Sequence, residues 1–269
     1  MSLISPKQII SKRFCKMKIV NDILQHAFNI CSDDLGRERP MRRRFCFPID
    51  KSRAILLLSE AYRIEVEGRQ YAFSPTKEIQ SQIAAVADWL TNTSYKPSLL
   101  LYGLPGTGKT TMAKAVQTMA KRLKSAYGRD GINRLQREAN DYFSDDVIQE
   151  FERMETAVLV PHYCTALDVA EMARDRRDQF SQICKITFLI VDDIGPEPRK
   201  VNNYGNECLP IAELLQRRYD QSLPTIITTN LGDAEIEGTS QFLGYGRRIM
   251  DRLNEMCEKI PYGARSFRI

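Results

Sequence analysis

The sequence predicts an α/β fold in which a parallel, five-stranded sheet lies between helices. Short apolar runs of strand type alternate with amphipathic segments from residue 98 onward, and this alternation is typical of parallel sheets covered on both faces. A glycine-rich loop joins the first of these strands to a helix. The chain has 269 residues, of which 43% are hydrophobic and 27% charged. Those values are ordinary for a globular protein with room for one large domain and an appendage.

The N-terminal part, residues 1–70, is expected to be a small, mostly helical segment that binds a partner. Helix-start residues at Ser5–Gln8 precede apolar residues at helical spacing as far as Phe28. A loop rich in Gly and Pro follows. We then expect a short helix over 52–62 and a small hairpin over 63–73, where polar and apolar residues alternate.

This N-terminal part is also the basic part of the chain. Residues 1–50 hold ten Lys and Arg against five Asp and Glu, an excess equal to the net charge of +5 of the whole chain. A basic segment on a neutral body favours an acidic partner, such as nucleic acid or an acidic protein surface. The cluster Arg42–Arg44 is followed by Phe45 and Phe47. These rings either stack on bases or dock on the protein core, and both interpretations stay open.

Several classes of protein are disfavoured by composition. The sequence contains no run of about 18 apolar residues and no N-terminal signal peptide, so we expect a cytoplasmic protein with no membrane partner. Seven cysteines are scattered without a CxxC pair, and the chain has only two histidines. Reduced thiols are therefore expected rather than a zinc site.

The second part, residues 71–269, begins with a helix opened by Ser74–Pro75 and carries the remaining predicted elements. The strand over 98–102 leads into the glycine-rich loop, and a helix follows directly. The polar stretch 121–156 is predicted to be helical. Strands and helices are then expected to alternate. They are a strand over 157–163, a helix from Ala166, a strand over 186–191, a helix over 204–219, a strand over 223–228, a helix over 246–257 and a final short strand.

The glycine-rich loop, Gly103–Thr110, reads GxxxxGK[ST], the pattern of a phosphate-binding loop. Glycines allow successive backbone N–H groups to point inward at an anion, and the N-terminus of the following helix adds a favourable dipole. Lys109 is expected to reach the outer phosphates and to act in catalysis, and the Thr110 hydroxyl to bind Mg²⁺. The predicted nucleotide-binding residues are Gly103, Pro105, Gly106, Thr107, Gly108, Lys109, Thr110 and Thr111. The alternative is an ordinary Gly-rich turn.

Polar side chains follow two later strands. Asp192 and Asp193 end the apolar run that begins at Phe188, and Asn230 ends the run that begins at Thr225. Because the carboxyl ends of parallel strands face the ligand crevice, we expect Asp192 to hold the Mg²⁺ shell and Asp193 to orient or deprotonate a water. Asn230 would hydrogen-bond the terminal phosphate or that water. Alternatively, these polar residues merely end buried strands.

With these motifs, the chain resembles the AAA+ ATPases of the bacterial helicase-loader group, that is, the DnaC/DnaI-like proteins and their IstB-like relatives in transposition. The matching segments are GLPGTGKTT (103–111), FLIVDDIG (188–195), PTIITTN (224–230), RRIMDRL (247–253) and RSFR (265–268). The resemblance covers about residues 75–269. It implies a P-loop domain of AAA+ type without a C-terminal lid domain, which binds ATP and Mg²⁺ and hydrolyses ATP.

The resemblance also implies roles for three arginines. Arg248 and Arg252 match the arginines that reach into the ATP of a neighbouring subunit, and Arg268 matches a terminal arginine likened to a sensor-2 residue. A guanidinium on the outer phosphate stabilises charge during phosphoryl transfer. Alternatively, Arg248 and Arg252 are exposed helix arginines paired with Asp251 or Glu255. The alternative for Arg268 is a residue near the chain end with no role in the site.

Three functions remain open from the sequence. The first is a helicase-loader-like factor in DNA replication, which forms an ATP-dependent homo-oligomer on single-stranded DNA and binds a replicative helicase. The second is an IstB-like helper of transposition with a transposase as its partner. The third is an ATP-gated interaction protein with little turnover, because Asp193 stands where many AAA+ proteins carry Glu. Glu197 is a nearby alternative carboxylate, and any turnover is expected to be slow and stimulated by DNA or a partner.

Overall fold

The computed structural model describes residues 45–269 except 93–94, 140–141, 204–205, 239–243 and 264–269. The chain divides into two units, residues 1–43 and 44–269, and all described residues belong to the second. The predicted N-terminal helix, the loop that follows it and the cluster Arg42–Arg44 lie outside the described residues, as does Arg268.

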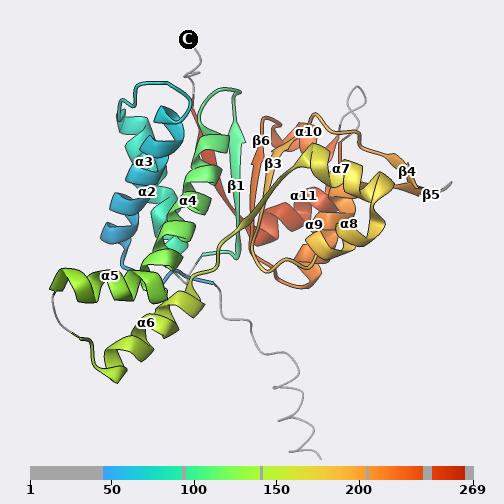
Figure 1. The fold of residues 1–269 in the computed structure, drawn as a ribbon. Helices are drawn as coiled ribbons and strands as arrows, with labels where there is room; N and C mark the ends of the chain where they lie inside the picture. The colour runs from blue at the N-terminus through green and yellow to red at the C-terminus, as the bar shows by residue number, and fades with distance from the viewer. Residues whose placement is uncertain (1–44, 93–94, 140–141, 204–205, 239–243, 264–269) are drawn as a thin grey trace, which may run out of the picture. The chain divides into compact units, whose positions relative to one another are not determined.

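The second unit is built on a five-stranded sheet in which all neighbouring strands are parallel (Figure 1). The strand order is β2-β3-β6-β1-β7. Their bounds are β1 (Ser98–Gly103), β2 (His162–Thr165), β3 (Leu189–Ile194), β6 (Thr225–Thr229) and β7 (Cys257–Tyr262). The predicted parallel, five-stranded sheet is therefore confirmed, and the first strand lies inside it with a neighbour on each side.

Helices cover both faces of this sheet. One face carries α2 (Lys51–Glu67), α3 (Lys77–Thr91) and α4 (Lys109–Tyr127), and the other carries α7 (Ala166–Asp175), α8 (Arg177–Ile183), α9 (Pro210–Asp220), α10 (Asp233–Glu237) and α11 (Arg247–Met256). Alternate residues of β1 supply the two cores, because Leu99 and Leu101 pack with the first helices and Leu100 with the second. Full burial of such a side chain contributes about 1.5–3 kcal/mol.

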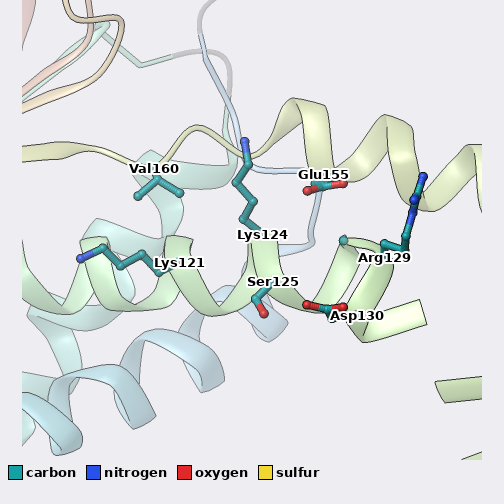
Figure 2. A pocket seen from close by; sticks show the side chains of 8 residues that line it. Lys121, Lys124, Ser125, Arg129, Asp130, Glu155 and Val160 are labelled. Atoms are coloured by element: carbon teal, nitrogen blue, oxygen red, sulfur yellow. The ribbon is translucent and has the colours of Figure 1, made fainter. Parts of the chain in front are cut away.

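The polar stretch 121–156 is helical, as predicted. It comprises the end of α4, then α5 (Arg129–Ala139) and α6 (Asp145–Ala157). Phe151 of α6 contacts Tyr127 and stacks on Phe143, although no residue of α6 is fully buried. A hollow of about 400 Å³ lies where the three helices meet, with Lys124 of α4 and Glu155 of α6 both lining it (Figure 2). Its mixed charges give it no clear preference for either sign of ligand.

Two local predictions were wrong. The hairpin expected over 63–73 does not form, because α2 continues to Glu67 and ends at Gly68. Arg63 pairs with both Glu60 and Glu67 along the helix, and such pairs stabilise helices despite the alternating pattern. The helix expected over 204–219 begins only at Pro210. Before it, β4 (Val201–Asn203) and β5 (Asn206–Cys208) form an antiparallel pair.

The segment before residue 70 shares the core of the second unit. Ala54, Leu58 and Tyr62 of α2 are buried with residues of α4. Phe47 is 1% exposed, and the ring of Phe45 lies against it and against Phe188. Both phenylalanines therefore dock on the core, as one of the two sequence interpretations expected. The domain boundary near residue 70 stays a prediction. Within the described part of the chain, no helix combines the length and apolarity needed to span a membrane.

Candidate active site

The glycine-rich loop connects β1 to α4 at the carboxyl end of the sheet. Gly103, Gly106 and Gly108 have φ values of 133°, 78° and 93°, which side-chain-bearing residues rarely adopt. At Gly103 a Cβ atom would lie 2.2 Å from the backbone oxygen of Tyr262, at the end of β7. The neighbouring strand therefore leaves no room for a side chain, and only glycine allows the turn.

Lys109 begins α4 and is 6% exposed. Its Nζ donates to the backbone oxygens of Gly103 and Leu104, at 2.8 and 2.7 Å. Thr107, 1% exposed, donates its hydroxyl to the same Leu104 oxygen at 2.8 Å. The ammonium group is thus held over the loop, where a bound phosphate would meet both it and the loop's backbone N–H groups.

Asp192 lies within hydrogen-bond distance of the loop helix. Its Oδ1 accepts from the hydroxyls of Thr110, at 3.0 Å, and Thr228, at 2.6 Å. The carboxylate is 4% exposed, and β3 and β6, which carry Asp192 and Thr228, are neighbouring parallel strands. Thr110 and Asp192 are 82 positions apart in the sequence, and the fold brings them together, as expected from their places at the ends of a loop and a strand.

A third hydroxyl completes the environment of Asp192 and was not anticipated from the sequence. Tyr163 of β2 donates to Oδ2 at 2.6 Å. Burial, followed by this hydrogen bond, raises the pKa of Tyr163 well above its ordinary value. The phenol therefore stays protonated and acts as a fixed donor at neutral pH. Its signal in the sequence was weak, since a tyrosine inside a strand is common.

Asp193 differs from its neighbour in geometry. It has a φ of 57°, and the pairing of β3 with β6 shifts register between Val191 and Ile194. Its backbone N–H donates to the Thr228 hydroxyl at 2.8 Å, and its Oδ1 accepts from Asn230 Nδ2 at 3.1 Å. The left-handed turn directs an exposed carboxylate, paired with an amide, toward the crevice.

Loop and strand ends line one cavity of about 1040 Å³. Lys109, Thr110, Asp193 and Asn230 are among its lining residues. The opposite wall comes from the end of α2, the segment that follows it and the start of α3, and it was missed in the sequence. The principal residues of that wall are Tyr62, Arg69, Tyr71, Phe73, Thr76 and Ile79. The signal available was three aromatic residues at positions 62, 71 and 73, around the segment that was interpreted as a hairpin.

Glu197 is not available as the alternative catalytic carboxylate. It is 3% exposed and forms an ion pair with Arg199 at 2.7 Å. It also accepts from the Gly195 backbone at 2.8 Å and from the Tyr245 hydroxyl. Glu197 therefore links the end of β3 to the segment before α11, and it does not line the nucleotide cavity.

Arg248 and Arg252 lie on α11, which packs on the face of the sheet opposite α2 and α4. Neither lines the cavity, and neither forms an ion pair with Asp251 or Glu255 among the described residues. The Arg252 guanidinium lies 5.3 Å from the centre of the Tyr219 ring, and its Nε and Nη1 are buried without a hydrogen-bond partner there. Unsatisfied buried donors are rare in folded proteins and call for an explanation.

The donor set at the centre of the site fits Mg²⁺. This cation prefers hard oxygen ligands, usually one or two protein oxygens together with phosphates and waters. Thr110 and Asp192 supply a hydroxyl and a carboxylate 3.0 Å apart beside the phosphate-binding loop. The described residues contain no cluster of three or more His, Cys, Asp or Glu that suits a metal held by protein alone.

A parallel sheet with a phosphate-binding loop after the inner strand β1, and an acid at the end of β3, which is separated from β1 by β6, defines the class of P-loop nucleotide-binding proteins. Comparison with protein families is more specific. Residues 99–233 match the model of the ATPase family associated with various cellular activities (AAA). The match covers half of the chain, and the chain belongs to this family.

Solved structures give weaker likenesses. The chain is similar to DnaI, at 16% identity and a TM-score of 0.46, over 76% of this chain and 94% of that one. It is similar to the DnaC helicase loader, at 18% identity and a TM-score of 0.38, over 71% and 93%. A primosome component from Streptococcus pyogenes serotype M3 gives 19% identity and a TM-score of 0.37, over 86% and 92%. None of the curated proteins compared matches the chain.

Proposed function

We propose that this protein binds Mg²⁺-ATP in the cavity between the loop and α2, hydrolyses it, and acts as a helicase-loader-like factor in DNA replication. The observation that carries the ATPase part is the Thr110–Asp192 contact at 3.0 Å, at the edge of a cavity of about 1040 Å³ that Thr110 lines and the buried Asp192 does not. That volume accommodates a nucleoside triphosphate, since ligand pockets usually measure about 300–1000 Å³.

We call the side of the cavity formed by the glycine-rich loop, the start of α4 and the ends of β3 and β6 the phosphate wall. Each of its polar side chains has a chemical role in this proposal. The loop N–H groups and Lys109 would bind the outer phosphates, and Thr110 and Asp192 would hold Mg²⁺, which would supply positive charge to them. Asp193 accepts a hydrogen bond from the attacking water and orients it, while Asn230 fixes the Asp193 carboxylate at 3.1 Å. Asp has a shorter side chain than Glu, so we expect slow turnover that rises when DNA or a partner is bound.

Assembly into a homo-oligomer is supported by the position of α11. Arg248 and Arg252 do not line the cavity of their own chain, so a contact with ATP requires a neighbouring subunit. Two buried nitrogens of Arg252 have no hydrogen-bond partner in the described part of the chain. The charge of Arg252, which has no ion pair among the described residues, would be balanced by a phosphate held in a second copy if the side chain turned outward.

The role in replication rests on the order of motifs along the sequence, which ends in RRIMDRL and RSFR as in the helicase-loader group. In this role the protein assembles on single-stranded DNA, its N-terminal segment binds a replicative helicase, and hydrolysis releases that helicase. The basic residues 1–50 suit contact with DNA phosphates or an acidic protein surface.

The test compares ATP hydrolysis without DNA, with single-stranded DNA and with duplex DNA of equal length, in the wild type and in Lys109→Ala. We expect single-stranded DNA to give the larger stimulation, and Lys109→Ala to abolish hydrolysis. Larger stimulation by duplex DNA would favour the helper of transposition. Equal, negligible rates under all conditions, with ATP still bound, would identify an ATP-gated interaction protein.

A further inference from the structure

Arg69 lies directly after α2, outside every motif of the nucleotide site. Its side chain lines the cavity, and its Nη1 donates to the hydroxyl of Thr111 at 3.4 Å. Thr111 belongs to the first turn of α4, two residues beyond Lys109. A guanidinium from a remote element thus reaches the phosphate-binding end of the loop helix.

The backbone that carries Arg69 is held in place. Tyr62 of α2 is buried against α4, and Glu65 accepts from the Thr118 hydroxyl of α4 at 2.7 Å. At the end of α2 the N–H of Arg69 donates to Val66 O at 3.1 Å, and the next N–H donates to Glu67 O at 2.8 Å. The side chain of Arg69 therefore starts from a fixed point beside the cavity.

Arg69 brings a positive charge to the cavity. Among the described residues it forms no ion pair, although Glu78 and Asp193 also line the cavity. Burial raises the pKa of the neighbouring Tyr62 to about 12, so that phenol stays neutral at physiological pH. By contrast, Arg63, two turns earlier on α2, pairs with Glu60 and Glu67. A free cation at the mouth of a phosphate site favours an anionic ligand.

We propose that Arg69 is a phosphate-binding residue of the nucleotide site, contacting the phosphate nearest the sugar. Lys109 reaches the outer phosphates, whereas Arg69 comes from the wall that also carries the aromatic rings of Tyr62 and Phe73. A phosphate beside Thr111, between Lys109 and that aromatic wall, is the one closest to the sugar and base. This inference rests on the proposed binding of ATP.

The experiment is calorimetric titration of ATP and ADP into the wild type, Arg69→Gln, Arg69→Lys and Lys109→Ala. We expect Arg69→Gln to weaken the binding of ATP and of ADP by the same factor, about tenfold. This is the effect expected from the loss of one charge-assisted hydrogen bond at a partly exposed site. Arg69→Lys should recover part of the loss, because it keeps the charge without the planar fork. Lys109→Ala should weaken the binding of ATP more than the binding of ADP, because Lys109 reaches the outer phosphates.

Two matched controls remove a cation elsewhere. Arg63→Gln removes an ion-paired arginine of α2, and Lys124→Gln removes a lysine from the other end of α4, in the hollow of Figure 2. Both should bind ATP as the wild type does, and thermal melting without nucleotide checks that all variants fold. Wild-type affinities in Arg69→Gln, or a loss confined to ATP, would overturn the inference. If wild type and Lys109→Ala bound ATP equally, the proposed function itself would fail.

Discussion

The two walls of the nucleotide cavity are built in different ways. The phosphate wall consists of strand ends and the first turn of α4, and its central side chains Lys109 and Asp192 are 6% and 4% exposed. The facing wall consists of the end of α2 and an irregular segment, where Tyr71 is 60% exposed. We expect the buried groups of the phosphate wall to hold the phosphates in a fixed geometry, and the exposed Asp193 and the facing wall to meet water and the rest of the nucleotide.

The adjoining acids of β3 offer the sharpest way to test the chemistry of the phosphate wall. Asp193→Ala should reduce the rate of ATP hydrolysis by roughly 10²–10⁴-fold, the usual range for a group that orients or deprotonates water. ATP affinity should change little, because Asp193 is exposed and does not hold the loop. Single-turnover hydrolysis together with equilibrium binding measures both. A parallel loss of affinity and rate would mean that Asp193 binds the nucleotide rather than the water.

Removing one hydrogen bond to Asp192 should have an intermediate effect on ATP hydrolysis. Tyr163→Phe removes the donor to Oδ2 and leaves the ring in place. The Mg²⁺ concentration needed for half-maximal hydrolysis should rise about 10- to 100-fold, because the groups that orient a metal ligand usually contribute that much. Tyr95→Phe, which loses a hydrogen bond to Asp88 of α3, is the matched control. An unchanged Mg²⁺ dependence in Tyr163→Phe would show that Asp192 is oriented by the threonines alone.

A substitution in the facing wall should have the smallest effect, and that effect should be on nucleotide affinity alone. Phe73→Ala removes a ring that lies 5.9 Å from that of Tyr62 within the cavity wall. ATP and ADP should each bind roughly tenfold more weakly, as expected for the loss of one aromatic contact to a base, while hydrolysis at saturating ATP stays unchanged. Inorganic triphosphate, which has no base, should bind equally to Phe73→Ala and wild type. An equal loss for triphosphate would contradict a base-binding role for this wall.

The phosphate wall is the part of the site that could be predicted from the sequence. Gly103–Thr110 is a local pattern whose function depends on spacing within eight residues, and the strand preceding Asp192 is recognisable by its apolar run. Both patterns are recognisable in the sequence, and the parallel sheet brings Thr110 and Asp192 within 3.0 Å of each other. Local patterns at strand ends therefore predict the phosphate wall.

The facing wall could not be predicted for a physical reason. Residues 63–67 alternate between polar and apolar types, yet the ion pairs of Arg63 and the burial of Tyr62 make them helical. Tyr163 and Arg69 acquire their contacts only through long-range packing, across 29 and 42 residues respectively. Neither contact leaves a local signal in the chain.

The central claim is that Thr110 and Asp192 hold Mg²⁺ at the phosphates of ATP in one pocket. The most direct test is ATP binding with and without Mg²⁺ in the wild type, Thr110→Ala and Asp192→Ala, with circular dichroism as a check on folding. We predict that Mg²⁺ strengthens ATP binding in the wild type and that both substitutions remove this strengthening, with hydrolysis falling by roughly 10²-fold or more. Mg²⁺-dependent binding that persisted in folded Asp192→Ala protein would contradict the account.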